Sequence, residues 1–142
     1  MKSVKQLLDN KGHEIYCIEP DASVFDAIKL MAEKEIGALL VMEGDKLAGI
    51  ISERDYARKV ILKGRSSRET PIKDIMTAQV TCAHPEQSVQ ECMALMTDKR
   101  VRHLPILENN LVTGMISIGD LVKAIIAEQQ FTIEQLEQYI SG

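Results

Sequence analysis

Tryptophan is absent from this 142-residue sequence, and aromatic residues make up only 4% of it. Long apolar runs are also missing, so no segment is expected to cross a membrane. The basic first residues lead into no apolar core of the kind that a secretion signal has. These absences favour a soluble, cytoplasmic protein whose core consists of aliphatic side chains and methionine.

Positive charge is not in excess, because 17 Lys and Arg residues face 21 Asp and Glu residues and give a net charge of −4. Nucleic acid is therefore not an expected partner. The sequence also lacks a Walker or dinucleotide-binding glycine loop, a zinc-ligand spacing and a recognisable nucleophile–base set. We predict that the chain is not an enzyme and holds no metal. The three cysteines are expected to be reduced and buried: Cys17, Cys82 and Cys92.

An internal repeat is the main feature of the sequence. Residues 15–60 align with residues 80–125 without a gap. Identical aligned pairs include Cys17/Cys82, Pro20/Pro85, Gly49/Gly114, Ser52/Ser117 and Asp55/Asp120. A match of this length, with prolines and glycines at the same positions, indicates a duplicated structural unit.

Each repeat is predicted to fold as β-α-β-β-α. A short apolar strand closed by a proline comes first, and a helix with a capping-box start and a helical spacing of apolar residues follows. Two strands joined by turn residues then form a hairpin, and a second helix begins near Glu53 or Ile118. The expected strands cover residues 15–18, 38–42 and 47–52 in the first repeat and 80–83, 103–107 and 111–117 in the second.

The chain is predicted to divide into five segments. They are an N-terminal helix and lead-in (1–14), the first repeat (15–62), a linker with a short helical turn (63–79), the second repeat (80–130) and a C-terminal helix (131–142). One repeat alone is too small to bury much apolar surface, so the two repeats are expected to cover each other's open faces.

Both repeats carry the motif Gly-x-Ile-Ser-x-x-Asp, at residues 49–55 and 114–120. With Asp-Ile-Met-Thr at 74–77 and Arg-His-Leu-Pro at 102–105, the sequence resembles a tandem CBS-domain pair, and in particular small bacterial proteins made only of this pair. The resemblance covers about residues 2–130. It implies an α/β (α+β) fold in which two repeats related by a pseudo-two-fold axis form a disc-like module with two clefts between them.

The resemblance also implies that these clefts bind an adenine-containing ligand, such as AMP, ADP, ATP, an NAD-type dinucleotide or S-adenosylmethionine. The motif aspartate would hold the ribose hydroxyls, and the serine would reach ribose or phosphate. One site would be formed by Ser52, Arg54, Asp55, Thr77, Val80, Thr81, Val101, Arg102 and His103. The other would be formed by Ile15, Tyr16, Ile36, Gly37, Ala38, Ser117 and Asp120. Arg58 is a further candidate for contact with phosphate.

The motif also has a physical rationale of its own. Its serine and aspartate lie where a strand gives way to a helix, and the unpaired amides of a first helical turn attract phosphate. A carboxylate accepts two hydrogen bonds, which suits the vicinal hydroxyls of ribose. A helix-capping box has the same Ser-x-x-Asp spacing, so a purely structural role stays open.

Alternatives also stay open for single side chains. Arg54 and Arg58 lie one helical turn apart and could hold phosphate or only face solvent. His103 could pack beside its apolar neighbours, and Tyr16 could be an ordinary strand residue instead of stacking on a base. A solvated role is expected for three other cations: Lys59, Lys63 and Arg65.

The sequence thus predicts a regulatory module that senses adenine nucleotides, takes part in energy sensing and signal transduction, and acts on a separate effector protein. It needs no obligatory cofactor. Because Gly119 replaces Arg54 in the second copy, the Asp55 site is expected to suit phosphate better. Excess apolar residues on the last helix, among them Val122 and Ile126, predict a homodimer. The alternative is a structural or dimerisation module with no bound nucleotide.

Overall fold

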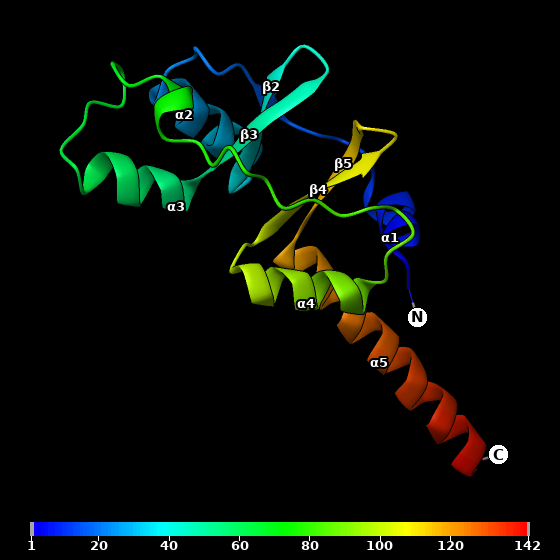
Figure 1. Ribbon diagram of the computed structural model, residues 1–142. Coiled ribbons are helices and arrows are strands. Elements are labelled where there is room, and N and C mark those ends of the chain that lie inside the picture. Colours follow the sequence, from blue (N-terminus) through cyan, green and yellow to red (C-terminus); the bar gives the residue numbers. More distant parts are fainter. Residues whose placement is uncertain (1, 142) are drawn as a thin grey trace. The chain divides into compact units, whose positions relative to one another are not determined.

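The computed structural model describes residues 2–141 (Figure 1). Met1, the first residue of the predicted lead-in segment, and Gly142, the last residue of the predicted C-terminal helix, lie outside the described residues. The chain forms two compact units whose boundaries differ from those of the repeats. We call residues 14–80 with 109–112 the repeat-1 unit, and residues 2–13, 81–108 and 113–141 the repeat-2 unit.

The repeat-1 unit contains a three-stranded sheet with the order β1-β2-β3. Strand β1 pairs parallel to β2, and β2 pairs antiparallel to β3 through a tight hairpin, as the β-α-β-β-α prediction requires. The elements are β1 (Cys17–Ile18), α2 (Val24–Lys34), β2 (Ala38–Glu43), β3 (Lys46–Ser52), α3 (Glu53–Tyr56), a π-helical segment (Ala57–Ile61) and a 3₁₀ turn (Ile72–Asp74).

The repeat-2 unit repeats this order with one strand reduced. Its two-stranded sheet pairs β4 with β5. Its elements are α1 (Val4–Lys11), α4 (Val89–Lys99), β4 (His103–Glu108), β5 (Leu111–Ser117) and α5 (Ile118–Ser141). Residues 131–141 of the last predicted segment are helical, but they are continuous with the second helix of the repeat.

The strand expected at 80–83 is present only as a single parallel bridge between Ala83 and Ile106. In the first repeat the amide of Leu40 donates to the carbonyl of Tyr16 at 3.1 Å. Pro105 stands at the position equivalent to Leu40 and has no amide hydrogen, so this ladder bond cannot form in the second repeat. The strand is therefore shortened by one substitution.

Each unit includes the segment that precedes the other repeat in the sequence. In the repeat-2 unit, the amide of Val4 donates to Gln87 O at 2.8 Å, so the N-terminal helix joins the second repeat. In the repeat-1 unit, the amide of Ile72 donates to Ala22 O at 2.9 Å, so the linker turn joins the first repeat. Ser3 bridges Ser88 in the same way as Pro71 bridges Ser23. The exchange positions α1 and the linker turn beside the two copies of the motif.

Helix and turn chemistry follows the predicted pattern closely. Ser88 and Glu91 form a complete capping box, whereas Ser23 accepts from the amide of Asp26 without the reciprocal bond. Helices α2 and α4 both end in a left-handed residue that is not glycine, Glu35 or Arg100, each with a φ of 55°. The equivalent positions therefore keep the same backbone conformation although the residue types differ.

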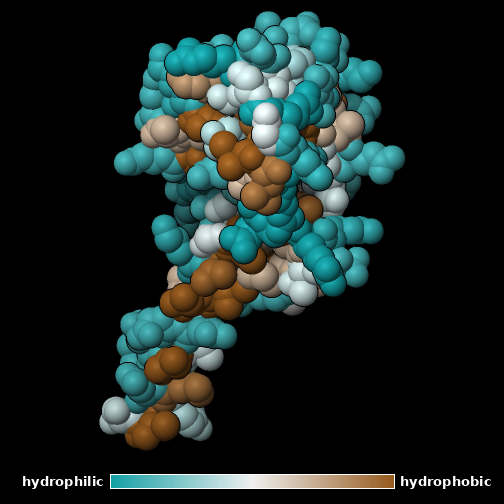
Figure 2. Space-filling model, turned by 90° about the vertical axis from the view of Figure 1, so that its left-hand side faces the viewer, coloured by the Kyte–Doolittle hydropathy of each residue, from teal (hydrophilic) through white to brown (hydrophobic). Residues whose placement is uncertain are grey.

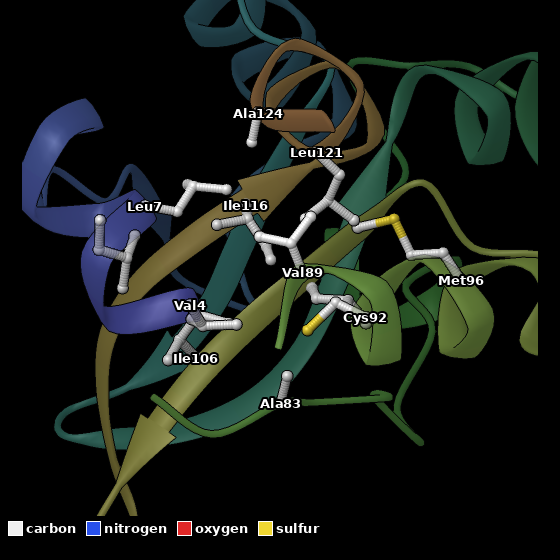
Figure 3. Packing of buried hydrophobic residues seen from close by; sticks show 12 residues of the cluster. Val4, Leu7, Ala83, Val89, Cys92, Met96, Ile106, Ile116, Leu121 and Ala124 are labelled. Carbon is white, nitrogen blue, oxygen red and sulfur yellow. The ribbon is translucent and has the colours of Figure 1, made fainter. Parts of the chain in front are cut away.

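Two apolar clusters hold the units. In the repeat-2 unit, Val4, Leu8 and Ile106 pack with residues of α4, β5 and α5 and are almost completely buried (Figure 3). In the repeat-1 unit, α2 packs Val24 and Met31 against the β2 and β3 side chains and the linker turn. Burial of one such side chain contributes about 1.5–3 kcal/mol. The core is aliphatic, as the composition indicates.

Candidate functional site

The motif of the first repeat spans the junction between β3 and α3. Ser52 is the last residue of β3 and the N-cap of α3, with an extended backbone (φ −126°, ψ 166°). Its hydroxyl accepts a hydrogen bond from the amide of Asp55 at 3.3 Å. The serine thus ends the strand and starts the helix, and it turns the Asp55 side chain back toward the strand end.

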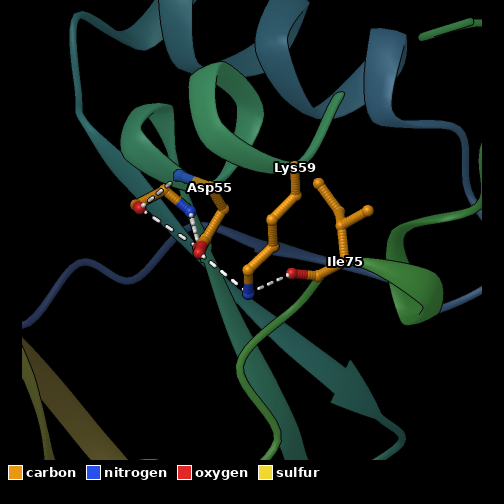
Figure 4. Close-up of polar contacts among 4 residues, drawn as sticks. Asp55, Lys59 and Ile75 are labelled. Carbon is orange, nitrogen blue, oxygen red and sulfur yellow. Dashed lines mark hydrogen bonds and ion pairs between the residues drawn. The ribbon is translucent and has the colours of Figure 1, made fainter. Parts of the chain in front are cut away.

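The Asp55 carboxylate is held from two directions (Figure 4). Its Oδ2 accepts hydrogen bonds from the amide of Ser52 at 2.9 Å and from the Ser52 hydroxyl at 3.1 Å. Its Oδ1 lies 3.3 Å from the ammonium of Lys59. Only 15% of the Asp55 side chain is exposed, against 44% for Lys59. The carboxylate is therefore shielded from solvent and has one partly exposed counter-charge.

Lys59 also links the motif to the linker, because its Nζ donates to Ile75 O at 2.9 Å (Figure 4). The expectation that Lys59 is merely solvated is wrong: the lysine lies one helical turn after Asp55, and the two side chains meet. The i,i+4 spacing was the signal that could have identified this pair. Arg65, also expected to be solvated, pairs with Asp74 at 3.2 Å.

The second motif has the same local geometry. Ser117 ends β5, its amide donates to Asp120 Oδ2 at 2.8 Å, and its hydroxyl accepts from the amide of Asp120 at 3.2 Å. The counter-charge, however, is Lys11 in the last turn of α1, whose Nζ lies 2.6 Å from Asp120 Oδ2. Lys11 also donates to the carbonyl of Met115. No local sequence pattern links Lys11 to Asp120, so the sequence could not reveal this pair.

The environment of Asp120 favours its ionised form. Burial alone would raise the pKa of this carboxyl, but the hydrogen bonds from Lys11 and Ser117 and the charge of Lys11 lower it overall. Asp120 remains an anion well into the acid range, with 22% of its side chain exposed. It is therefore a permanent hydrogen-bond acceptor at neutral pH.

His103 belongs to the same electrostatic group as Asp120. Burial lowers the pKa of His103, the charges of Lys11 and Arg102 lower it further, and Asp120 opposes them. The imidazole is therefore neutral at pH 7, and it can donate or accept one hydrogen bond instead of offering a positive charge to phosphate. Arg102 is exposed, and its carbonyl accepts from the amide of Ile118 at 2.9 Å.

The motif glycines are required by close packing. A Cβ on Gly49 would lie 2.7 Å from the Met76 sulfur and 2.8 Å from Thr77 O. A Cβ on Gly114 would lie 2.8 Å from a methyl carbon of Leu8. Both glycines let an exchanged segment approach its sheet, and a register shift near Val41 and Met42 adds a bulge beside Gly49.

The arginines predicted to hold phosphate extend into solvent. Arg54 and Arg58 are both exposed, and within residues 2–141 neither has a hydrogen-bond or ion-pair partner. Their guanidinium groups are available to a ligand or to water, and the structure leaves that choice open. Their role in phosphate binding stays a prediction.

The other predicted residues fall in both units. In the repeat-1 unit, Gly37 O accepts from the amide of Glu53 at 3.1 Å, and Thr77 exchanges two backbone hydrogen bonds with Ile50. The Tyr16 hydroxyl donates to Glu14 at 3.0 Å, and Lys34 lies 5.6 Å from its ring centroid. Ile15, Ile36 and Val80 are half-buried and Ala38 is buried.

Thr81, Val101 and His103 are half-buried in the repeat-2 unit, and Arg102, in the same unit, is exposed. The predicted grouping of these residues with Ser52 and Asp55 stays a prediction. The same holds for the grouping of Ile15, Tyr16, Ile36, Gly37 and Ala38 with Ser117 and Asp120.

The described part of the chain contains no cluster of three or more His, Cys, Asp or Glu side chains arranged to hold a metal ion. Over the same residues, no helix is both long and apolar enough to span a bilayer. The three cysteines are free thiols, and the expectation that all are buried holds only for Cys92, because Cys17 is exposed and Cys82 is half-exposed.

Comparison with known families identifies the repeat. The family model of the CBS domain matches residues 4–62 and again residues 72–127. The chain belongs to the CBS-domain family. The two matches include the exchanged segments as well as the repeats, so each CBS domain begins in the segment that packs on the other copy. Tandem CBS pairs are regulatory modules.

Relatives of similar size confirm the assignment. A CBS-domain protein from Burkholderia ambifaria MC40-6 is 57% identical, with a TM-score of 0.87 over 93% of this chain and 99% of that chain. The mitochondrial CBS domain-containing protein CBSX3 of Arabidopsis thaliana is 43% identical over 100% of this chain and 70% of its own length. The CBS domain pair of protein MJ0100, solved with 5′-methylthioadenosine and S-adenosylmethionine, shares the fold at 23% identity, with a TM-score of 0.80 over 90% of this chain and 98% of that chain.

Proposed function

We propose that this CBS pair senses adenosine-containing metabolites, namely AMP, ADP, ATP or an NAD-type dinucleotide, and reports their level to a separate effector protein. The observation that carries the proposal is the duplicated, shielded carboxylate. Asp55 and Asp120 each lie at a strand-to-helix junction and are only 15% and 22% exposed. Two such anions at equivalent positions suit two similar ligand sites.

The chemistry of the carboxylates fits a ribose diol. A carboxylate has about four lone-pair positions, and at Asp55 the Ser52 donors converge on Oδ2. Within residues 2–141, the polar partner of Oδ1 is the Lys59 ammonium, and 44% of the Lys59 side chain is exposed. When ribose hydroxyls donate to the carboxylate, the lysine is free to move to the ligand phosphate. The lysine would then pair with the phosphate, and the carboxylate would be held by the neutral hydroxyls and the Ser52 hydrogen bonds.

The same exchange at Asp120 would release Lys11 and with it a tie between α1 and the second motif. Because α1 bonds through Val4 to the residues before α4, a ligand at Asp120 would change how firmly the N-terminal helix is held. A ligand shifts an equilibrium only if it binds the two states with different affinity, and loss of the Lys11 contact supplies such a difference. This tie is our proposed route from ligand to effector or dimer partner.

A shared fold supports the ligand class. MJ0100 carries S-adenosylmethionine and 5′-methylthioadenosine on the same CBS-pair fold, and both ligands contain adenosine. In this chain, Arg54, Arg58, Arg102 and His103 stay our candidates for contact with the parts of the ligand beyond ribose. The cytoplasmic location also stays a prediction.

A second candidate function is a structural module with no bound nucleotide, which the hydrogen bonds of the motif favour. Both aspartates accept from the serine amide three residues before them, as a helix-capping box requires. In that case the aspartates serve only the helix starts.

Measurement of the Tm in the presence of AMP, ATP, NADH or S-adenosylmethionine distinguishes the two candidate functions. At a concentration about a hundred times Kd, a ligand adds about 2.7 kcal/mol, which raises Tm by roughly 5–10 °C. The Asp55→Ala/Asp120→Ala protein should show no shift. The matched control is Asp26→Ala/Glu91→Ala, which removes the acid from the same position of the other two helix starts and should keep the shift. An absent response in the wild type, or an unchanged one in the Asp55/Asp120 variant, would establish the structural alternative.

A further inference from the structure

The C-terminal half of α5 packs against nothing in its own unit. Every residue from 129 to 141 is exposed, including large apolar side chains (Figure 2). Ile133 is 48% exposed, Leu136 57% and Ile140 82%. An isolated helix of this length, with β-branched residues and no basic side chain after Lys123, is marginal in water. The segment therefore needs an apolar surface to cover it.

The exposed side chains form a regular stripe. Val122, Ile126, Gln129, Ile133, Leu136 and Ile140 follow one another at alternating intervals of four and three residues. This is the spacing of the a and d positions of a coiled coil, and only Gln129 is polar. Leu121 and Ala124 are buried in the core of the unit, so the stripe is distinct from the side of α5 that faces this core.

We propose that this stripe binds the stripe of a second copy of the chain as an antiparallel helix pair. The proposal extends the self-association expected of the module and does not depend on nucleotide binding. In antiparallel order, a and d positions of the two helices alternate as partners. Val122 then meets the partner's Ile140, Ile126 meets the partner's Leu136, and Gln129 meets the partner's Ile133. All six positions are used, over about 27 Å of helix.

The charges beside the stripe select the antiparallel order. Lys123 and Glu137 both occupy the e position, and in an antiparallel pair the e positions of the two helices face each other. Lys123 of each copy therefore meets the partner's Glu137, which gives two equivalent ion pairs. On the opposite flank Ile125 meets the partner's Tyr139. A parallel pair would set e against g, so Lys123 would face the partner's Ile118, Glu137 would face the partner's Thr132, and neither ion pair would form.

A buried polar atom supplies an independent indication. Within residues 2–141, Gln90 Oε1 is the one side-chain nitrogen or oxygen that is buried without a hydrogen-bond partner. The Gln90 residue lines a hollow of about 400 Å³, together with Ile125, Gln129, Thr132 and Ile133 of α5. These residues lie on the Ile125 flank at the centre of the antiparallel pair, where the partner's Gln129 and Thr132 approach. A partner amide can donate to Gln90 Oε1, and partner side chains can fill the hollow.

Sedimentation equilibrium of the full chain at micromolar concentration tests the pairing. Leu136→Glu places a charge in two equivalent apolar layers and should raise the dimer Kd about a hundredfold or more. Phe131→Glu is the matched control, because Phe131 is 62% exposed on the outer f position and should leave the Kd within about twofold. A monomeric wild type, or equal effects of the two substitutions, would overturn the proposal. Both sites are exposed, and a cooperative unfolding transition in circular dichroism confirms that each variant folds.

A charge exchange tests the orientation. Lys123→Glu and Glu137→Lys should each weaken the dimer by about fivefold, and the double variant should return to within about twofold of the wild type. The two residues are too far apart on one helix to contact each other, so recovery can only come from contact between copies. Additive losses in the double variant would overturn the antiparallel pairing.

Titration with ATP in the same variants keeps this proposal separate from the proposed function. Leu136→Glu should bind nucleotide with the wild-type Kd. A wild type that dimerises but binds no nucleotide would contradict the sensing function alone, and a nucleotide-binding monomer would contradict the helix pair alone.

Discussion

The two motif aspartates share one local geometry but obtain their counter-charges differently. Asp55 faces Lys59, one turn later on the same helical segment, whereas Asp120 faces Lys11, in the helix that begins the chain. The residue aligned with Lys59 in the second repeat is Ala124, which is buried in the core. Both copies thus share the carboxylate and its capping hydrogen bonds. The cation is four residues away in the sequence in the first copy and more than a hundred residues away in the second.

The helices that begin in the two motifs also differ, in length and in regularity. Asp55 lies within four residues of α-helix, Glu53–Tyr56, which π-helical turns follow at Ala57–Ile61, and Val60 of these turns is buried in the core. After Asp120 a regular helix continues to Ser141. π-Turns commonly occur at functional sites because they redirect side chains within a helix. The first copy is thus a self-contained site, and the second is tied to both ends of the chain.

The largest expected difference between the copies lies in their glycines. Gly49→Ala should lower the free energy of unfolding by about 2–3 kcal/mol, because the new Cβ meets the rigid carbonyl of Thr77. Gly114→Ala should cost about 1 kcal/mol, because the new Cβ meets only the end of the Leu8 side chain, which can shift. Urea denaturation measures both values. Equal losses, or a larger loss at Gly114, would show that α1 holds its sheet as rigidly as the linker does.

A smaller effect is expected from the long-range ion pair of the repeat-2 unit. The pKa of Asp120 is lower in the folded protein than in the unfolded chain, so its contribution to stability is present at neutral pH and is lost as pH falls below the ordinary range of an aspartate. Lys11→Met should therefore cost about 1 kcal/mol at pH 7 and flatten the loss of stability below pH 4.

Lys73→Met is the control for this measurement. It removes a more exposed pair in the repeat-1 unit, in which Lys73 lies 2.8 Å from Asp21, and should leave the acid profile unchanged. Denaturant unfolding from pH 7 to pH 3 gives the comparison. A Lys11→Met profile parallel to that of the wild type would remove Lys11 as the main cause of the Asp120 shift.

The smallest expected difference concerns the aligned thiols, Cys17 and Cys82. Burial raises the pKa of both, but Cys17 is exposed and Cys82 is only half-exposed, so a disulfide reagent at pH 8 should modify Cys17 first. Burial, with a contribution from Glu91, raises the pKa of Cys92 to about 11, and this thiol should react only on unfolding. Mass spectrometry of labelled peptides over time gives the order. Early labelling of Cys92 would indicate that α4 opens in the native state.

Local sequence patterns were sufficient to predict most of the fold. The aligned motifs, helix starts and hairpin turns gave the β-α-β-β-α order, because capping boxes and turn residues act within a few positions. The shortening of the strand at 80–83 was also encoded, by Pro105 in place of Leu40, but its effect depends on which strand lies alongside. Such local patterns could not predict that each unit includes the segment preceding the other repeat, because the residues that meet, such as Val4 and Gln87, are far apart in the sequence.

The candidate site was predicted only in part, for the same reason. Ser52, Asp55 and their second copies were identified as a group, because their relation is local. Lys59 could have been paired with Asp55 from its spacing, whereas Lys11 could not have been paired with Asp120. The cations matter because each of them occupies the carboxylate that the proposed ligand would need.

Calorimetric titration of ATP into the wild type, Asp55→Ala and Asp120→Ala tests the central claim most directly. If each carboxylate holds one ribose, each single variant should lose one class of sites and keep the other, with the stronger phosphate-dependent binding lost in Asp55→Ala. Binding heats that are the same in all three proteins would contradict the account.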